Sequence, residues 1–211
     1  MYSKDKNAII EAALALKEYE LIALTGGNVS VREENGDYVV TPSGMSYENM
    51  KEDDLIVFDK DGNIIEGNRK PSVDTIALKY IFDNMPEVNA IIHTHQPYAT
   101  AAGLIGDVLP VAVTTLSNVT LGAVNVAPYS NPASLEMGIQ TVEYARGKRA
   151  VILKHHGVVT IGANLKEALY AAVYMESAAK TYLVAKAAGE PALMTEKQNE
   201  EAVESFANYG Q

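Results

Sequence analysis

The four histidines of the chain fall in two short clusters, and their spacing suits metal chemistry. His93 and His95 follow residues 88–92, an apolar run typical of a buried strand. Residues i and i+2 of a strand point to the same face, so both imidazoles can converge on one ion. A divalent ion held by two imidazoles needs at least one more protein ligand, and His155 or His156 is the histidine left to supply it. The two clusters together therefore predict a metal site.

The ligand types indicate which metal this is and what it does. Cysteine is absent, which excludes thiolate ligands and disulfides. Imidazole ligands favour zinc or another first-row divalent ion, with manganese and cobalt as alternatives. Three protein ligands leave a coordination position open, which is typical of a catalytic site. Histidine pairs with this spacing also occur by chance on solvated strands, but the second cluster favours a catalytic metal that polarises a carbonyl or activates a water.

Asp74 is the candidate acid or base beside such an ion. It lies in an otherwise uncharged stretch, residues 71–75. A carboxylate near a metal-held substrate can transfer protons. The alternative is that Asp74 merely complements the dipole in the first turn of a helix. Periodicity alone favours this second, structural role.

Two glycine-containing turns, residues 25–28 and 41–44, are suited to binding an anion. Glycine permits close approach of the backbone, and Asn and Ser side chains donate hydrogen bonds. Ser72, at a predicted helix start, adds the N-terminal end of a helix. Turns of this composition are common, so each signal is weak when taken alone.

Composition excludes several classes of partner. The 211 residues include 17 Lys and Arg against 27 Asp and Glu, which gives a net charge of −10. No basic patch stands out, so we expect no nucleic-acid or anionic-membrane partner. We find no apolar run long enough to span a membrane and no apolar segment typical of a signal peptide near the N-terminus. We therefore expect a soluble cytoplasmic protein.

Apolar periodicity and turn residues predict the elements that position these side chains. The predicted helices cover residues 5–19, 72–84, 99–104, 133–145, 164–189 and a last segment from 195. The predicted strands cover residues 28–32, 38–40, 55–58, 64–65, 88–94, 111–115, 123–127, 151–153 and 158–160. Asn164 with Glu167, and Thr195 with Gln198, have the spacing of helix capping boxes.

This order of elements predicts an α/β fold. Helices bracket a group of central strands, so we expect helices on both faces of a sheet. Tight turns join several strand pairs, which favours a mostly antiparallel or mixed sheet over a doubly wound nucleotide-binding one. We find no repeat, low-complexity tract or linker, so we expect a single domain over residues 1–211.

Five motifs occur in an order and spacing that resemble the class II aldolase/adducin-head family. They are Gly27-Asn28-Val29-Ser30, Thr41-Pro42-Ser43-Gly44, Lys70-Pro71-Ser72, His93-Thr94-His95 and His156-Gly157. The resemblance covers essentially the whole chain. It implies a three-layer α/β/α domain with a mostly antiparallel central sheet. It also implies a fourfold-symmetric homotetramer with active sites between subunits.

The resemblance further implies roles for individual residues. The zinc ligands are matched by His93, His95 and His156, which leaves His155 as the neighbour that faces away. The substrate-phosphate pocket is matched by Gly27, Asn28, Ser43, Gly44 and Ser72. Asp74 matches the acid/base carboxylate, which is usually Glu in the aldolases. Tyr209 resembles a C-terminal tyrosine that transfers protons.

The implied reaction is the retro-aldol cleavage of a ketose 1-phosphate, of the L-fuculose 1-phosphate type, to dihydroxyacetone phosphate and an aldehyde. In such a reaction a metal ion stabilises the negative charge left when the carbon–carbon bond breaks. The family also contains L-ribulose-5-phosphate 4-epimerases, which use the same cleavage and rejoin the aldehyde after it rotates. Adducin-type relatives without the metal serve protein interaction, but the intact histidines argue against that class here.

Departures from the family pattern bear on the choice between aldolase and epimerase. Val73 replaces a serine of the phosphate pocket, and Asp74 is the shorter carboxylate found in epimerases. Asn118 stands where we place the catalytic aspartate of the epimerases, and an amide cannot take up a proton as a carboxylate does. Thr114 stands where aldolases often carry tyrosine. The compact length also favours the aldolase, and we prefer the aldolase to the epimerase.

Overall fold

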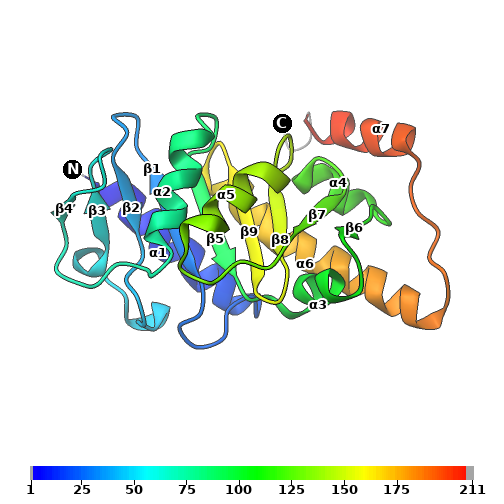
Figure 1. The fold of residues 1–211 in the computed structure, drawn as a ribbon, viewed down its shortest axis with the longest axis horizontal. Coiled ribbons are helices and arrows are strands. Elements are labelled where there is room, and N and C mark those ends of the chain that lie inside the picture. The colour runs from blue at the N-terminus through cyan, green and yellow to red at the C-terminus, as the bar shows by residue number, and fades with distance from the viewer. Residues whose placement is uncertain (1, 208–211) are drawn as a thin grey trace.

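A computed structural model describes residues 2–207 of the chain. Its centre is a nine-stranded sheet with the strand order β4-β3-β2-β1-β5-β9-β8-β7-β6 (Figure 1). The strands are β1 (Asn28–Arg32), β2 (Tyr38–Val40), β3 (Ile56–Phe58), β4 (Ile64–Glu66), β5 (Ala90–Thr94), β6 (Val108–Leu109), β7 (Val124–Ala127), β8 (Ala150–Leu153) and β9 (Gly157–Gly162). Among these strand pairs only β7 and β8 are parallel, so the sheet is mixed and mostly antiparallel, as predicted.

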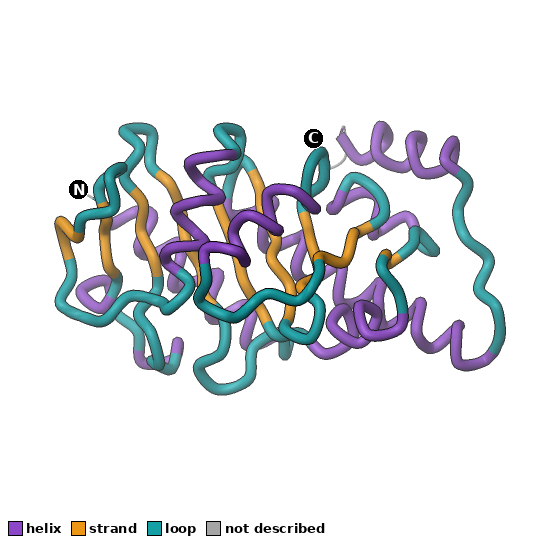
Figure 2. The backbone as a smooth tube through the Cα atoms, in the orientation of Figure 1, coloured by secondary structure: helices purple, strands orange, loops and turns teal. Residues whose placement is uncertain are grey.

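Helices cover both faces of the sheet. They are α1 (Ser3–Glu18), α2 (Thr75–Asn84), α3 (Pro97–Ile105), α4 (Thr114–Thr120), α5 (Leu135–Tyr144), α6 (Leu165–Ala188) and α7 (Glu196–Ala207). Figures 1 and 2 show α2 and α5 in front of the strands, and α1 and α6 behind them. No helix of the described residues is both long and apolar enough to cross a bilayer.

Side chains along the central strands point alternately to the two faces of the sheet and pack against the helices on each face. On β5, Ile91 packs into the core beneath α2 and α5, whereas Ala90 and Ile92 pack against α1 and α6. This is the period-2 alternation of a strand that is buried on both faces. The predicted three-layer α/β/α fold is therefore confirmed, and the strand that carries His93 is buried between the two helical layers.

Strand register brings distant motifs to one end of the sheet. Asn28 of β1 lies opposite His93 of β5. On its other side β5 pairs with β9, so that His93 lies opposite Val159. The strands β8 and β9 form a hairpin whose turn contains His155 and His156. Both histidine clusters thus meet at the same end of neighbouring strands.

The strand predicted at residues 111–115 is wrong. Helix α4 begins at Thr114, and the preceding residues are irregular. Val111 is buried, and its carbonyl accepts a hydrogen bond from the N–H of Met194 (2.9 Å) rather than from a neighbouring strand. Its apolar, β-branched character therefore reflects packing beneath the segment that leads to α7.

The predicted helix start at Ser72 is also displaced. Helix α2 begins at Thr75, with Asp74 at the N-cap position. The Ser72 carbonyl accepts hydrogen bonds from the backbone N–H and the hydroxyl of Thr75. Ser72 therefore belongs to the turn before the helix rather than to its cap.

Both predicted capping signals lie at helix starts. Thr195 Oγ1 accepts the Gln198 N–H (3.2 Å), and Gln198 Oε1 accepts the Thr195 N–H (2.9 Å), which is a complete capping box at α7. At α6, the Asn164 side chain accepts the Glu167 N–H, but Glu167 reaches back to the N–H of Ala163 instead of that of Asn164.

Replacing Thr195 by Ala removes the hydroxyl half of the α7 capping box. We expect the start of α7 to lose about 1 kcal/mol of local stability. Hydrogen exchange should therefore accelerate in residues 196–207 and stay unchanged in α6. Unchanged exchange in α7 would contradict the contribution of the cap.

Candidate active site

His93 is the deepest of the three converging histidines. Its side chain is 1% exposed, and its Nδ1 contacts the carbonyl oxygen of Val158 on β9 at 2.8 Å. A carbonyl only accepts, so Nδ1 carries the proton and donates it. The Nε2 of His93 is therefore left as the atom that can bind a metal.

The other two histidines complete a cluster with His93. The Nε2 atoms of His93 and His95 are 3.1 Å apart. The ring centroid of His156 lies 4.7 Å from that of His93 and 5.2 Å from that of His95. One nitrogen from each of the three rings lies within 4.8 Å of the others. His93 is buried, His156 is half-buried and His95 is exposed, so the cluster opens to one side.

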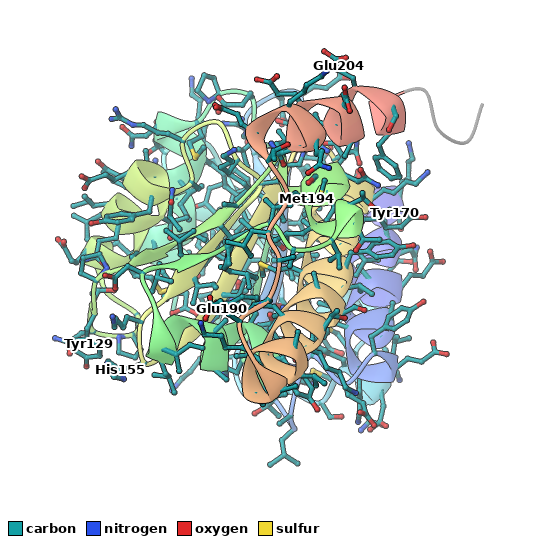
Figure 3. The ribbon with its side chains drawn as sticks, turned by 90° about the vertical axis from the view of Figure 1, so that its right-hand side faces the viewer. Tyr129, His155, Tyr170, Glu190, Met194 and Glu204 are labelled. Carbon is teal, nitrogen blue, oxygen red and sulfur yellow. The ribbon has the colours of Figure 1, made fainter. Side chains whose placement is uncertain are left out.

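The backbone at His155 explains why only its neighbour joins the cluster. His155 has a φ of 60°, a left-handed conformation that turns the chain sharply between β8 and β9. Its ring lies against Tyr129, with 6.5 Å between the ring centroids (Figure 3). The structure therefore brings His156, and not His155, to His93 and His95.

Two glycines allow the segments of the site to approach one another. Gly27 has a φ of 102°, and a Cβ there would lie 2.5 Å from the carbonyl oxygen of His93. A Cβ on Gly157 would lie 2.3 Å from the carbonyl oxygen of Thr94 and 2.9 Å from Cδ2 of His95. All three distances are too short for a side chain, so the strands close around the histidines only because these positions are glycine.

The local electrostatics keep the three imidazoles neutral. Burial lowers the pKa of His93 to about 3, assisted by His156 and His95. Burial likewise lowers the pKa of His95 and of His156, while Asp74 opposes the shift in both. Nδ1 of His156 is buried with no hydrogen-bond partner among the described residues. Neutral, converging imidazoles with an unpaired buried nitrogen fit a divalent ion such as zinc.

Asp74 lies beside the cluster with its carboxylate fixed at both oxygens. Oδ2 accepts a hydrogen bond from Nδ2 of Asn28 (2.8 Å), and Oδ1 accepts one from the N–H of Ala133 (3.1 Å). Oδ2 also lies 4.0 Å from Nε2 of His93. Although Asp74 occupies the N-cap position of α2, its side chain makes no capping hydrogen bond. The carboxylate is therefore directed toward the histidines and not toward its own helix.

The residues matched to a phosphate pocket lie on three adjoining segments. The Ser43 N–H donates to the Lys70 carbonyl (2.9 Å), and the Ser72 N–H donates to the Thr41 carbonyl (3.2 Å). These bonds hold the turn that contains Ser43 and Gly44 against the segment that ends at Ser72. The third segment, with Gly27 and Asn28, joins them through the hydrogen bond from Asn28 to Asp74. Oδ1 of Asn28 is buried and has no partner among the described residues.

Two contributors to the site carry no signal in the sequence. Ala133 adopts a φ of 59°, a strained conformation for alanine, and presents its N–H to Asp74. The hydroxyl of Tyr47, a buried residue in a short loop helix, donates to the carbonyl of Gly27 (2.9 Å). Tyr209 lies outside the described residues.

Asn118, a departure from the family pattern, has a structural partner. With its amide nitrogen turned toward them, Asn118 donates to the carbonyl oxygens of Thr114 and Ala202, each at 3.0 Å. The first belongs to α4 and the second to α7. A carboxylate accepts only and could not make these bonds. The amide at this position therefore joins α7 to α4.

Comparison with known proteins shows which family the chain belongs to. The sequence profile of the class II aldolase and adducin N-terminal domain matches residues 7–183. The chain belongs to this family. It is 32% identical over its whole length to a 5-deoxy-D-ribulose 1-phosphate aldolase of Bacillus thuringiensis, covering 99% of that protein. It is also 32% identical to an L-ribulose-5-phosphate 4-epimerase of Salmonella paratyphi C, over 87% of this chain and 86% of that protein.

The chain is also similar in fold to a solved structure. An L-fuculose 1-phosphate aldolase superposes with a TM-score of 0.93 and 32% identity, covering 98% of both chains. In this chain, the cluster of histidines and the Asp74 carboxylate lie at one end of the central sheet.

Replacing Gly157 by Ala tests the close approach of β9 to the histidine segment. The added Cβ must displace the Thr94 carbonyl and the His95 ring. We expect a loss of about 1–3 kcal/mol in the free energy of unfolding, measured by urea denaturation. Zinc binding should also weaken, because His95 moves. The control is Gly189→Ala, since nothing lies within 4 Å of that position; equal effects in both variants would contradict the argument.

Proposed function

We propose that this chain is a metal-dependent aldolase that cleaves a ketose 1-phosphate to dihydroxyacetone phosphate and an aldehyde. The observation that carries the proposal is the cluster of three neutral imidazoles with the Asp74 carboxylate 4.0 Å from His93. The relatives named above act on sugar phosphates, which supports an enzyme of the lyase type. We propose that residues 1–211 form one catalytic domain and that the protein works in the cytoplasm.

Zinc is the ion we propose for His93, His95 and His156, with manganese or cobalt as alternatives. When bound there, it supplies Lewis-acid stabilisation of the negative charge that develops on substrate oxygens. The protein contributes the orientation of the ligands. The Val158 carbonyl fixes the tautomer of His93, and the turn at His155 sets the direction of His156.

Asp74 is the residue we assign to proton transfer at carbon. Cleavage leaves electron density on the carbon of the ketone fragment, which must take up a proton to give dihydroxyacetone phosphate. Asn28 and Ala133 hold the carboxylate in one orientation, so it does not need to reorganise as the proton moves. The unpaired Oδ1 of Asn28 can accept a hydrogen bond from a substrate hydroxyl.

The hydrogen bonds at the turns determine which donors remain for a phosphate. The N–H groups of Ser43 and Ser72 are used between segments, so they cannot serve it. Ser72 Oγ accepts the Asp74 N–H, which leaves the Ser72 hydroxyl hydrogen free to donate. We propose that the phosphate is held by the hydroxyls of Ser43 and Ser72 together with the backbone of Gly27, Asn28 and Gly44. Val73 is 63% exposed beside this set and offers no hydroxyl.

We further propose that the site is completed by a second copy of the chain in a homotetramer. His95 is exposed in the single chain, and Tyr98, Tyr170 and Tyr174 are each at least 36% exposed. Tyr209 follows α7 and is proposed to serve the oxygen of the departing aldehyde.

L-Ribulose-5-phosphate 4-epimerase is the second candidate function. The similarity to the Salmonella epimerase and the short Asp74 carboxylate favour it. Asn118 favours the aldolase, because its amide cannot take up a proton as a carboxylate does. The same amide donates to two carbonyl oxygens, and breaking these hydrogen bonds would loosen the contact between α4 and α7. A non-catalytic interaction module is the third possibility.

A phosphorus NMR time course separates these functions. Zinc-loaded protein is mixed in turn with L-fuculose 1-phosphate, 5-deoxy-D-ribulose 1-phosphate and L-ribulose 5-phosphate. We expect a new dihydroxyacetone phosphate signal from a ketose 1-phosphate, abolished by a chelator. Conversion of L-ribulose 5-phosphate alone would establish the epimerase. Absence of both zinc and turnover would favour the interaction module.

Replacing His156 by Ala tests the metal assignment. We expect the variant to lose bound zinc and turnover while the fold stays intact, measured by metal analysis, the cleavage assay and circular dichroism. The matched control is His155→Asn, because asparagine tolerates the left-handed backbone at that position. The control should keep both zinc and activity, and retained turnover in His156→Ala would overturn the assignment.

Replacing Asp74 by Asn tests the assigned proton transfer. We expect exchange of the carbon-bound proton of dihydroxyacetone phosphate with solvent deuterium to slow by at least ~100-fold. Asp83→Asn, an exposed carboxylate on the same helix that pairs with Lys79, is the control and should leave exchange unchanged. Wild-type exchange in Asp74→Asn would return Asp74 to a structural role.

A further inference from the structure

A second buried polar cluster lies directly behind the histidine pair. Thr94 and Gln96 alternate with His93 and His95 along the chain and are almost completely buried. Thr94 Oγ1 donates to Oε1 of Gln96 (2.6 Å), and Nε2 of Gln96 donates to the carbonyl of Ala172 on α6 (3.2 Å). The side of this segment that faces away from the site is therefore bonded to α6.

Glu176, one turn further along α6, holds the residues that follow. Its side chain is 9% exposed, and both oxygens are used. Oε1 accepts the N–H of Tyr98 and Oε2 accepts the N–H of Ala99, each at 2.8 Å. These N–H groups belong to the first turn of α3, where Gln96 at the N-cap position makes no side-chain cap. A carboxylate from another helix thus caps α3, and it complements the positive end of the helix dipole.

We propose that Glu176 is a positioning residue for the metal ligands. Only Gln96 and Pro97 separate His95 from the clamped Tyr98, and Pro97 restricts the backbone between them. His95 is the exposed member of the cluster, and its ring lies close to Gly26 and Gly157 and to the rings of His93 and His156. The clamp at Glu176 together with the Gln96 amide fixes the chain directly after His95, and the bond from Thr94 to Gln96 ties the residue before His95 to the same anchor.

Both residues that hold this segment, Ala172 and Glu176, belong to α6. Ala172 and Glu176 are four residues apart and lie on the same face of α6, which packs along the sheet beside α1 (Figure 3). Three hydrogen bonds to these two residues tie Gln96, Tyr98 and Ala99 to one helix. Charge-assisted hydrogen bonds of this kind are the stronger ones in proteins, so the segment is held before any ion binds.

This inference rests on the proposed metal site, so the test begins with the unaltered protein. Zinc affinity is measured by competition with a chromophoric chelator. In Glu176→Gln, one N–H loses its acceptor and meets an amide donor instead. We expect the affinity for zinc to fall by ~10- to 100-fold, the range found for residues that orient metal ligands. The visible spectrum of the cobalt-loaded variant should also change, because His95 is displaced.

The matched control is Glu167→Gln on the same helix. Glu167, in the first turn of α6, also accepts a backbone N–H, that of Ala163 just before the helix, and pairs with Arg149. Thermal unfolding of the metal-free proteins gives the stability lost in each variant. We expect Glu167→Gln to bind zinc within about twofold of the wild type, because Glu167 lies away from the histidine segment.

A second variant covers the case in which Glu176→Gln fails to fold. Gln96→Leu removes the bonds to Thr94 and Ala172 and should weaken zinc binding in the same direction. Wild-type affinity in the folded variants, or an equal loss in Glu167→Gln, would overturn the positioning role. Failure of the wild type itself to bind zinc would instead overturn the proposed function.

Discussion

Antiparallel pairing of β5 with β9 is the constraint on which the site depends. This ladder places His93 opposite Val159 and lets its ring donate to the carbonyl of Val158. On its other side β9 pairs with β8, and this hairpin forms the turn that carries His156. A shift of one residue in this register would turn His93 to the opposite face of the sheet and separate the two clusters.

The segment that contains His93 and His95 is packed closely on both sides. Glycines at 27 and 157 let neighbouring backbone come within contact of the histidine segment. On the opposite side, α6 holds the same segment through Ala172 and Glu176. As a result the three histidines differ in burial: His93 is fixed in the core, while His95 and His156 lie toward the surface.

Local sequence patterns predicted much of this arrangement. The alternation of His93 and His95, the apolar strands and the capping box at Thr195 all depend on neighbours in sequence, and the structure contains each of them. Residues 111–115 were wrongly predicted as a strand, because β-branched residues packed beneath a distant segment have the same composition as a strand. Strand propensity reports burial on a packed surface, whichever element supplies that surface.

Other parts of the site could not be predicted, because their partners are remote along the chain. Ala133 contributes an N–H through a strained backbone that alanine does not signal. Glu176 lies in a long Ala-rich helix where a glutamate is expected on the solvated face, and only the packing of α3 explains its burial. The choice between His155 and His156 came from resemblance to the family, and in the structure the left-handed turn at His155 accounts for it.

The most direct test of the central claim is a crystal structure of the zinc-loaded protein with anomalous data collected at the zinc edge. We expect one strong anomalous peak, about 2.0–2.1 Å from a nitrogen of each of His93, His95 and His156, with a further ligand position not filled by this chain. A peak at another site, or a fourth protein ligand that closes the coordination sphere, would contradict it.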